Sequence, residues 1–225
     1  MTDTLHFAQH RLQEGALIFM ALVYCARLYW LTRFKAGKDR QPRTGRHSTD
    51  PRKGWMYSMA MIAMPWAMES SRRHWLIYLQ FVLFHLGVVA AIGLSFVIPY
   101  GPGVLTPSVV MGVQALTGAA FVIGVLRLLR RVGSPVMRRI SSPDDYFSLS
   151  LLTVWFLFAT LAAPNNLSGG ETTSLVYFVL TAFFLIYVPF SKISHYLYYP
   201  FTRFYLGRSL GHRGVYPFER GRQTT

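Results

Sequence analysis

Two histidines stand inside apolar stretches of the chain, His85 and His195. Ionisable side chains are costly in a bilayer, and those that occur there usually have a function. An imidazole nitrogen is a standard axial ligand of haem iron. Two imidazoles on two packed helices would complete a six-coordinate b-type haem, so this pair predicts a bis-histidine haem site.

The composition is that of a membrane protein. The chain has 225 residues, of which 52% are hydrophobic and 16% aromatic, and its mean hydropathy is +0.29. Apolar blocks long enough to cross the hydrocarbon core as helices occur at about 13–33, 75–98, 104–128, 147–163 and 174–191. The last is expected to continue as helix to about residue 199. We therefore predict an all-α integral membrane protein, a single domain with five transmembrane helices.

The distribution of charge predicts the orientation of these helices. The net charge is +14, yet the connections 99–107 and 164–173 contain no lysine or arginine, whereas 34–54, 127–139 and the tail 200–225 are basic. This alternation follows the positive-inside rule and places the N-terminus outside and the C-terminus in the cytoplasm. Anionic lipid or a partner subunit is therefore the expected partner of the basic faces, and nucleic acid is not expected to bind.

Residues 54–68 are apolar but too short to span the membrane. Trp55 and Trp66 stand near the ends and basic residues flank the segment. This pattern predicts a short helix lying in the cytoplasmic interface. Its several methionines adapt to irregular surfaces, and a groove for a partner protein is the alternative.

The remaining acidic residues and the single cysteine can be explained by structural roles. Ser142, Pro143, Asp144 and Asp145 are typical of a helix start, and a proton-uptake pair is the alternative for the two acids. The single Cys25 cannot form an internal disulfide or hold an iron–sulfur cluster, so such a cluster must belong to another chain. No set of catalytic residues points to an enzyme acting alone.

Basic residues at the cytoplasmic ends of the two histidine-bearing helices are candidates to bind the haem propionates. They are Arg72, Arg73, Lys192 and Arg203. Each could instead extend to lipid headgroups. His74 rivals His85 as a ligand because it lies eleven residues earlier, on nearly the same helical face. We prefer His85, since His74 is beside Arg73 at the interface with water.

The chain resembles the membrane gamma subunit of respiratory nitrate reductase and the related cytochrome b subunits that pair with heterodisulfide-reductase-like iron–sulfur proteins. The stretches that carry the resemblance are Phe84-His85-Leu86-Gly87, residues 64–70 (MPWAMES), residues 141–146 (SSPDDY) and residues 188–195 (VPFSKISH). It implies a bacterial or archaeal cytoplasmic membrane, and a haem on the cytoplasmic side ligated by His85 and His195.

One departure from that family changes the expected number of haems. The nitrate reductase subunit holds a second haem through two further histidines, and the matching positions here are Ser95 and Tyr177. Serine is a poor iron ligand and tyrosine ligation is specialised. We therefore predict one haem b, with the outer half of the helix bundle filled by protein.

These observations predict an electron-transfer subunit that connects the quinone pool with a cytoplasmic iron–sulfur partner through one haem b. Lys192, Tyr196 and Tyr187 are the candidate quinone contacts. Two other classes of protein are a haem-free membrane anchor and a small transporter. The spans carry fewer polar residues than a transporter is expected to need, and haem absorbance separates the cytochrome from both.

Overall fold

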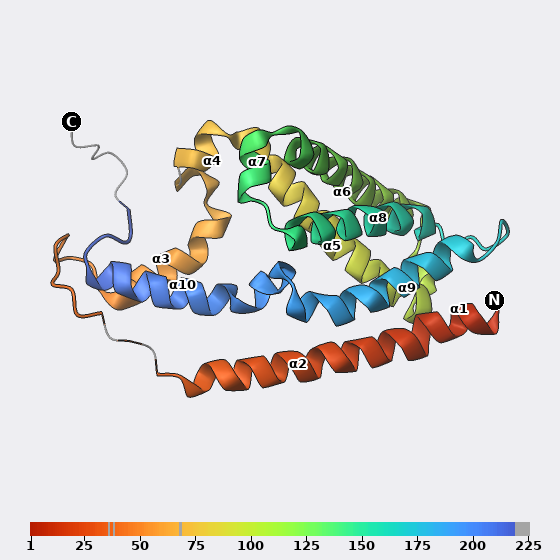
Figure 1. The fold of residues 1–225 in the computed structure, drawn as a ribbon, viewed down its shortest axis with the longest axis horizontal. Coiled ribbons are helices and arrows are strands. Elements are labelled where there is room, and N and C mark those ends of the chain that lie inside the picture. The colour runs from red at the N-terminus through yellow and green to blue at the C-terminus, as the bar shows by residue number, and fades with distance from the viewer. Residues whose placement is uncertain (36, 38, 68, 219–225) are drawn as a thin grey trace. The chain divides into compact units, whose positions relative to one another are not determined.

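A computed structural model describes residues 1–35, 37, 39–67 and 69–218. Every regular element in this part of the chain is a helix (Figure 1). The helices form two compact units: unit 1 contains Met1–Leu28 and Leu79–Ile193, and unit 2 contains Tyr29–Tyr78 and the chain from Ser194 onward. Residue 68 of the predicted interfacial segment and residues 219–225 of the predicted basic tail lie outside the described residues.

The predicted all-α membrane fold is confirmed. Among the described residues, five helices are long and apolar enough to cross a membrane, and they cover Asp3–Arg33, Trp75–Tyr100, Pro107–Gly133, Pro143–Ala162 and Thr172–Phe190. Large apolar side chains on these helices, among them Leu22, Val89 and Met111, are 65%, 66% and 69% exposed. A helix that is apolar all round and keeps such side chains on its surface is suited to lipid rather than water.

The first span begins at Asp3, earlier than the expected start near residue 13. It consists of α1 (Asp3–Phe7), the π-helical turn η1 (Ala8–Leu12) and α2 (Gln13–Arg33). Thr2 caps this helix, because its hydroxyl accepts the Leu5 N–H at 3.3 Å. Leu5 is fully buried. The polar residues near the N-terminus thus form a helical turn that packs into the bundle.

Unit 1 is built around α8. Its further helices are α5 (Trp75–Tyr100, of which Leu79 onward belongs to this unit), η4 (Pro102–Val104), α6 (Pro107–Gly133), α7 (Pro135–Ile140), α8 (Pro143–Ala162) and α9 (Thr172–Tyr187). Helix α8 packs against both α6 and α9, and α1 and η1 pack against α9. A methyl group on Gly87 would collide with Ala120, and one on Gly124 with Thr153. Small residues therefore allow close helix contact, as is common in membrane bundles.

The helix expected to run to residue 199 is interrupted. After α9 come the short turn η5 (Val188–Phe190), the extended Ser191 and a second turn, η6 (Lys192–Ser194). Helix α10 (His195–His212) begins only then. Pro189 has no N–H and its ring crowds the preceding turn, which ends an α-helix. The Ser191 hydroxyl donates to the Val188 carbonyl at 3.1 Å and accepts the Ile193 N–H at 3.2 Å, so it satisfies the interrupted backbone.

Unit 2 is centred on a close pair of helices, α3 (Pro51–Ala60) and α10. A methyl group on Gly54 would collide with the Gly207 carbonyl, and one on Gly211 with the Asp50 carbonyl. The two helices therefore touch through their backbones. Of the segment predicted to lie in the interface, the part up to residue 60 belongs to α3. It is followed by η2 (Met61–Ala63), η3 (Pro65–Ala67) and α4 (Glu69–Arg73).

Polar contacts join the loop before α3 to the end of α10. The Arg213 guanidinium donates to both carboxylate oxygens of Asp39, at 2.7 and 3.1 Å, and this lowers the pKa of Asp39. The Thr49 hydroxyl donates to the Gly211 carbonyl at 3.0 Å, and the Gly45 N–H donates to the Arg213 carbonyl at 2.9 Å. These contacts hold the loop and α10 together within unit 2.

A proline near the end of α5 explains a buried glutamine in α2. Pro99 lies inside α5 and has no N–H for the carbonyl of Ser95, four residues earlier. The Gln13 side chain supplies the missing donor, with its Nε2 3.0 Å from that carbonyl oxygen. Gln13 is 1% exposed. In the bilayer such a carbonyl must be satisfied by protein, so Gln13 compensates for Pro99.

This pairing predicts a non-additive pair of substitutions. Gln13→Leu should lower the free energy of unfolding by about 1–2 kcal/mol, because the Ser95 carbonyl loses its donor. In a Pro99→Ala background the same substitution should cost only a few tenths of a kcal/mol, since position 99 regains an N–H. Equilibrium unfolding in mixed detergent micelles measures both values. Equal costs in the two backgrounds would show that Gln13 does not serve this carbonyl.

The glycine contact in unit 2 predicts a second effect. Gly54→Ala should lower the free energy of local unfolding of the α3–α10 pair by about 1–3 kcal/mol, because the backbones must separate. Tryptic cleavage after Arg52 and Lys53 would then become faster. Gly93→Ala is the control, since no atom lies within 4 Å of the added methyl. Unchanged cleavage of Gly54→Ala would contradict the close contact.

Candidate haem-ligand histidines and a polar cluster at the start of α8

His85 lies on α5 in unit 1, half-buried, and its ring contacts Phe81. Its Nδ1 is 2.7 Å from the carbonyl oxygen of Phe81, one turn earlier in the helix. The centroids of the Phe81 and His85 rings are 4.2 Å apart. A carbonyl oxygen only accepts hydrogen bonds, so this distance assigns the proton of a neutral imidazole to Nδ1.

This tautomer fits an axial ligand of haem iron. With the proton on Nδ1, the lone pair of the neutral ring is on Nε2. Metal-binding histidines commonly donate their other N–H to a backbone carbonyl, and this contact orients the ring and raises its basicity. The His85 ring is therefore chemically suited to be one axial ligand of haem iron.

His195 is the first residue of α10 in unit 2, and its side chain is exposed. The two predicted ligands thus belong to different units. The rival His74 is also exposed and precedes α5 in unit 2, where its carbonyl accepts the N–H groups of Ile77 and Tyr78 at 3.0 and 3.1 Å. His74 therefore caps the start of a helix through its backbone.

The four basic residues predicted to bind propionates have different surroundings. Arg72 is exposed on α4, and Arg73 pairs with Glu69 at 2.5 Å on the same helix. The Arg203 guanidinium lies over the Tyr199 ring, 5.2 Å from its centroid. These three arginines belong to unit 2, whereas Lys192 belongs to unit 1 and binds two side chains at the start of α8.

Ser95 and Tyr177, at which the family resemblance predicted the loss of a second haem, are packed side chains. Tyr177 is fully buried and Ser95 is 2% exposed. The Tyr177 hydroxyl donates to the Ala91 carbonyl at 2.5 Å, and the Ser95 hydroxyl donates to the Ile92 carbonyl at 2.8 Å. The indole of Trp155 stacks on Tyr177, with centroids 6.3 Å apart. Both positions are therefore part of the protein core.

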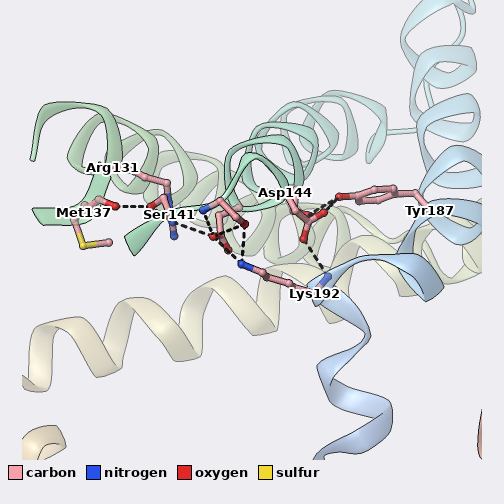
Figure 2. A network of polar contacts seen from close by, with 9 residues as sticks. Arg131, Met137, Ser141, Asp144, Tyr187 and Lys192 are labelled. Atoms are coloured by element: carbon pink, nitrogen blue, oxygen red, sulfur yellow. Dashed lines mark hydrogen bonds and ion pairs between the residues drawn. The ribbon is translucent and has the colours of Figure 1, made fainter. Parts of the chain in front are cut away.

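A polar cluster at the start of α8 joins residues that are distant in sequence (Figure 2). The Tyr187 hydroxyl, at the end of α9, donates a short hydrogen bond to Asp144 Oδ1. It also lies 2.8 Å from the Ser148 hydroxyl. The Lys192 backbone N–H donates to Asp144 Oδ2 at 3.2 Å. One carboxylate thus contacts the chain on both sides of the interruption after α9.

The neighbouring carboxylate of Asp145 both caps α8 and forms an ion pair. Its Oδ2 accepts the Ser142 N–H at 2.7 Å, which caps α8 as the sequence predicted. The same oxygen pairs with Lys192 Nζ at 2.9 Å, and that ammonium also donates to the Ser142 hydroxyl at 2.8 Å. Arg131 Nη1 lies 3.9 Å from this oxygen, so two cations face one capping carboxylate.

The cluster continues toward α7 through Ser141. Arg131 Nη1 donates to the Ser141 hydroxyl at 2.5 Å, and that hydroxyl donates to the Met137 carbonyl at 2.6 Å (Figure 2). The sequence indicated the cap at Ser142. It predicted Lys192 as a contact of a haem propionate or of quinone, and Tyr187 as a separate quinone contact. Nothing in the spacing of these residues predicted that they meet.

The packed state of Tyr177 leads to a measurable prediction. Tyr177→Phe should lower the free energy of unfolding by about 0.5–1.5 kcal/mol, because the Ala91 carbonyl keeps its helical donor. Tyr177→Ala should lower it by about 3–5 kcal/mol, because a large cavity forms in the core. Unfolding in mixed micelles provides the comparison. A tolerated Tyr177→Ala would mean that the position does not belong to the packed core.

Comparison with known proteins supplies little further information. No family model matches the chain, and no solved structure matches it. The chain is similar to a protein of Nitratidesulfovibrio vulgaris (strain Hildenborough), with 27% identity over 149 residues, which are 64% of this chain and 66% of that protein. The match thus spans just under two thirds of the relative. The name of that protein states no activity, so the function must be argued from the residues.

Proposed function

We propose that this chain is the membrane cytochrome b subunit of a respiratory redox complex in a bacterial or archaeal cytoplasmic membrane. One haem b, held by His85 and His195, would carry single electrons between the quinone pool and a cytoplasmic iron–sulfur partner. The protein contributes binding and orientation of the haem.

The contact between His85 Nδ1 and the Phe81 carbonyl is the observation that carries this proposal. A histidine that ligates a metal commonly donates its other ring N–H to a backbone carbonyl. Here the 2.7 Å contact directs the proton to Nδ1, so Nε2 of this half-buried ring would be the nitrogen that ligates the haem iron. The second ligand, His195, begins α10 directly after the fifth span.

Packing in the outer half of unit 1 supports one haem rather than two. Trp155, Phe156, Tyr177 and Phe178 are all buried, and Trp155 Nε1 donates to the Thr181 hydroxyl at 2.9 Å. Side chains that fill the interior and satisfy each other leave the single haem to the cytoplasmic half. A quinone must then approach that haem closely in order to exchange electrons.

The basic loops and tail support a cytoplasmic partner. Among the basic residues of unit 2, Arg72, Arg40 and Lys35 are exposed. In the orientation predicted from charge they lie on the cytoplasmic side. Such a surface would attract an acidic face of an iron–sulfur protein and would also bind anionic lipid.

Difference spectra of variants test the ligand pair. In the purified chain, His85→Ala and His195→Ala should each abolish the reduced-minus-oxidised absorbance of a low-spin haem b, because each removes an axial ligand. His47→Ala is the control, since this exposed residue lies in the loop before α3. His74→Ala should also keep the wild-type spectrum.

Two outcomes would contradict the assignment. A spectrum lost in His74→Ala and kept in His85→Ala would transfer the first ligand to His74. A wild-type chain without haem absorbance, but which still binds an iron–sulfur protein, would be a haem-free membrane anchor.

A further inference from the structure

Arg127 is a half-buried cation on a membrane-spanning helix of unit 1. It lies on α6, on the face where Ile123 and Gly124, one turn earlier, are buried. Its guanidinium carbon is 5.1 Å from the centroid of the Phe84 ring on α5, and Phe84 is 6% exposed. The charge of Arg127 is therefore partly withdrawn from water at a contact between two helices.

No carboxylate neutralises Arg127 in the part of the chain that the structure describes. None of the ion pairs found there includes this side chain. The charged groups close enough to act on it are those of Arg131 and Arg130, which are also cations. Arg131 donates to the Ser141 hydroxyl and faces Asp145, so its charge is compensated while that of Arg127 is not.

A cation in this position calls for an anion from outside the chain. Ionisable side chains in membrane spans are costly and usually pair with another group, and a charge withdrawn from water without a partner lowers stability. The phenyl ring of Phe84 attracts a cation only weakly and carries no negative charge. The planar guanidinium of Arg127 can instead donate two parallel hydrogen bonds to the oxygens of a phosphate.

The neighbouring side chains of α6 indicate a lipid as the source of that phosphate. Leu126 and Leu129 are 51% and 64% exposed, as suits side chains that contact acyl chains. Arg130, one turn after Arg127, is an exposed second cation. Arg127 lies six residues before the end of α6 at Gly133, which is about 9 Å along the helix axis. From this depth the long side chain can extend toward the headgroups.

We propose that Arg127 and Arg130 bind the phosphate of one anionic phospholipid at the C-terminal end of α6, with its acyl chains against Leu126 and Leu129. In the orientation predicted from charge this end faces the cytoplasm, where basic pockets between spans bind anionic headgroups. The site consists of residues of unit 1 alone and needs no haem, so it goes beyond the proposed function.

Lipid binding to the purified full chain tests this site. Native mass spectrometry in a mild detergent should show one bound phosphatidylglycerol, retained roughly ten-fold better than phosphatidylcholine. Arg127→Gln should abolish this preference, because glutamine carries no charge. Arg127→Lys should keep part of it, since lysine keeps the charge but not the paired hydrogen bonds. Arg139→Gln is the matched control: it removes the same charge from an exposed position on α7 and should bind like the wild type.

Thermal unfolding gives a second readout with a variant that is expected to fold. Without added lipid, Arg127→Met should unfold at the wild-type temperature or above it, because methionine keeps much of the packing and removes an uncompensated charge. Phosphatidylglycerol should raise the unfolding temperature of the wild type and not that of Arg127→Met. A lower unfolding temperature of Arg127→Met without lipid would overturn the proposal, since Arg127 would then be satisfied within the chain.

Four results of the binding experiment would also overturn it. Equal retention of phosphatidylglycerol and phosphatidylcholine by the wild type would exclude a site for an anionic headgroup. Equal losses in Arg127→Gln and Arg139→Gln would show a general attraction of the basic surface. Displacement of the lipid by inorganic phosphate would show a site for a free anion. An unchanged preference in Arg127→Gln, together with a shifted haem potential, would assign Arg127 to a haem propionate.

Discussion

Backbone groups within a bilayer must find their hydrogen-bond partners inside the protein, and much of this structure follows from that requirement. Pro99 removes the helical donor of the Ser95 carbonyl, and Gln13 from another helix replaces it at 3.0 Å. After α9, Pro189 ends the helix and the Ser191 hydroxyl satisfies groups on both sides of the break. At Pro99 and at the break after Pro189, a polar side chain thus satisfies backbone groups that the helix leaves unpaired.

The same requirement links the interior of unit 1 to its proposed chemistry. Tyr177 and Trp155 are large side chains with one polar atom each, and both polar atoms find acceptors within the bundle. These side chains fill the core of unit 1 around Tyr177. At His85 the backbone carbonyl of Phe81 accepts a hydrogen bond from the imidazole instead, and under the proposed function the other ring nitrogen would ligate the haem iron.

The spans and the helix start at Ser142 could be predicted because they depend on local properties: the length of apolar blocks and the chemistry of a cap. The early start at Asp3 was missed because Thr2, Asp3 and Gln9 are polar, although Leu5 and Ala8 pack inward. The close contact of Gly54 with Gly207 could not be predicted, since the partner of a small residue is set by tertiary packing.

For the site, histidine chemistry and family resemblance selected His85 and His195, whereas the polar cluster at the start of α8 joins Asp144 to Tyr187 and Lys192, which are 43 and 48 positions away in sequence. Pyridine haemochrome analysis of the purified wild-type chain tests the central claim most directly. The account predicts one haem b per chain. Two haems per chain would contradict the packed outer half around Tyr177, and the absence of haem would contradict the cytochrome itself.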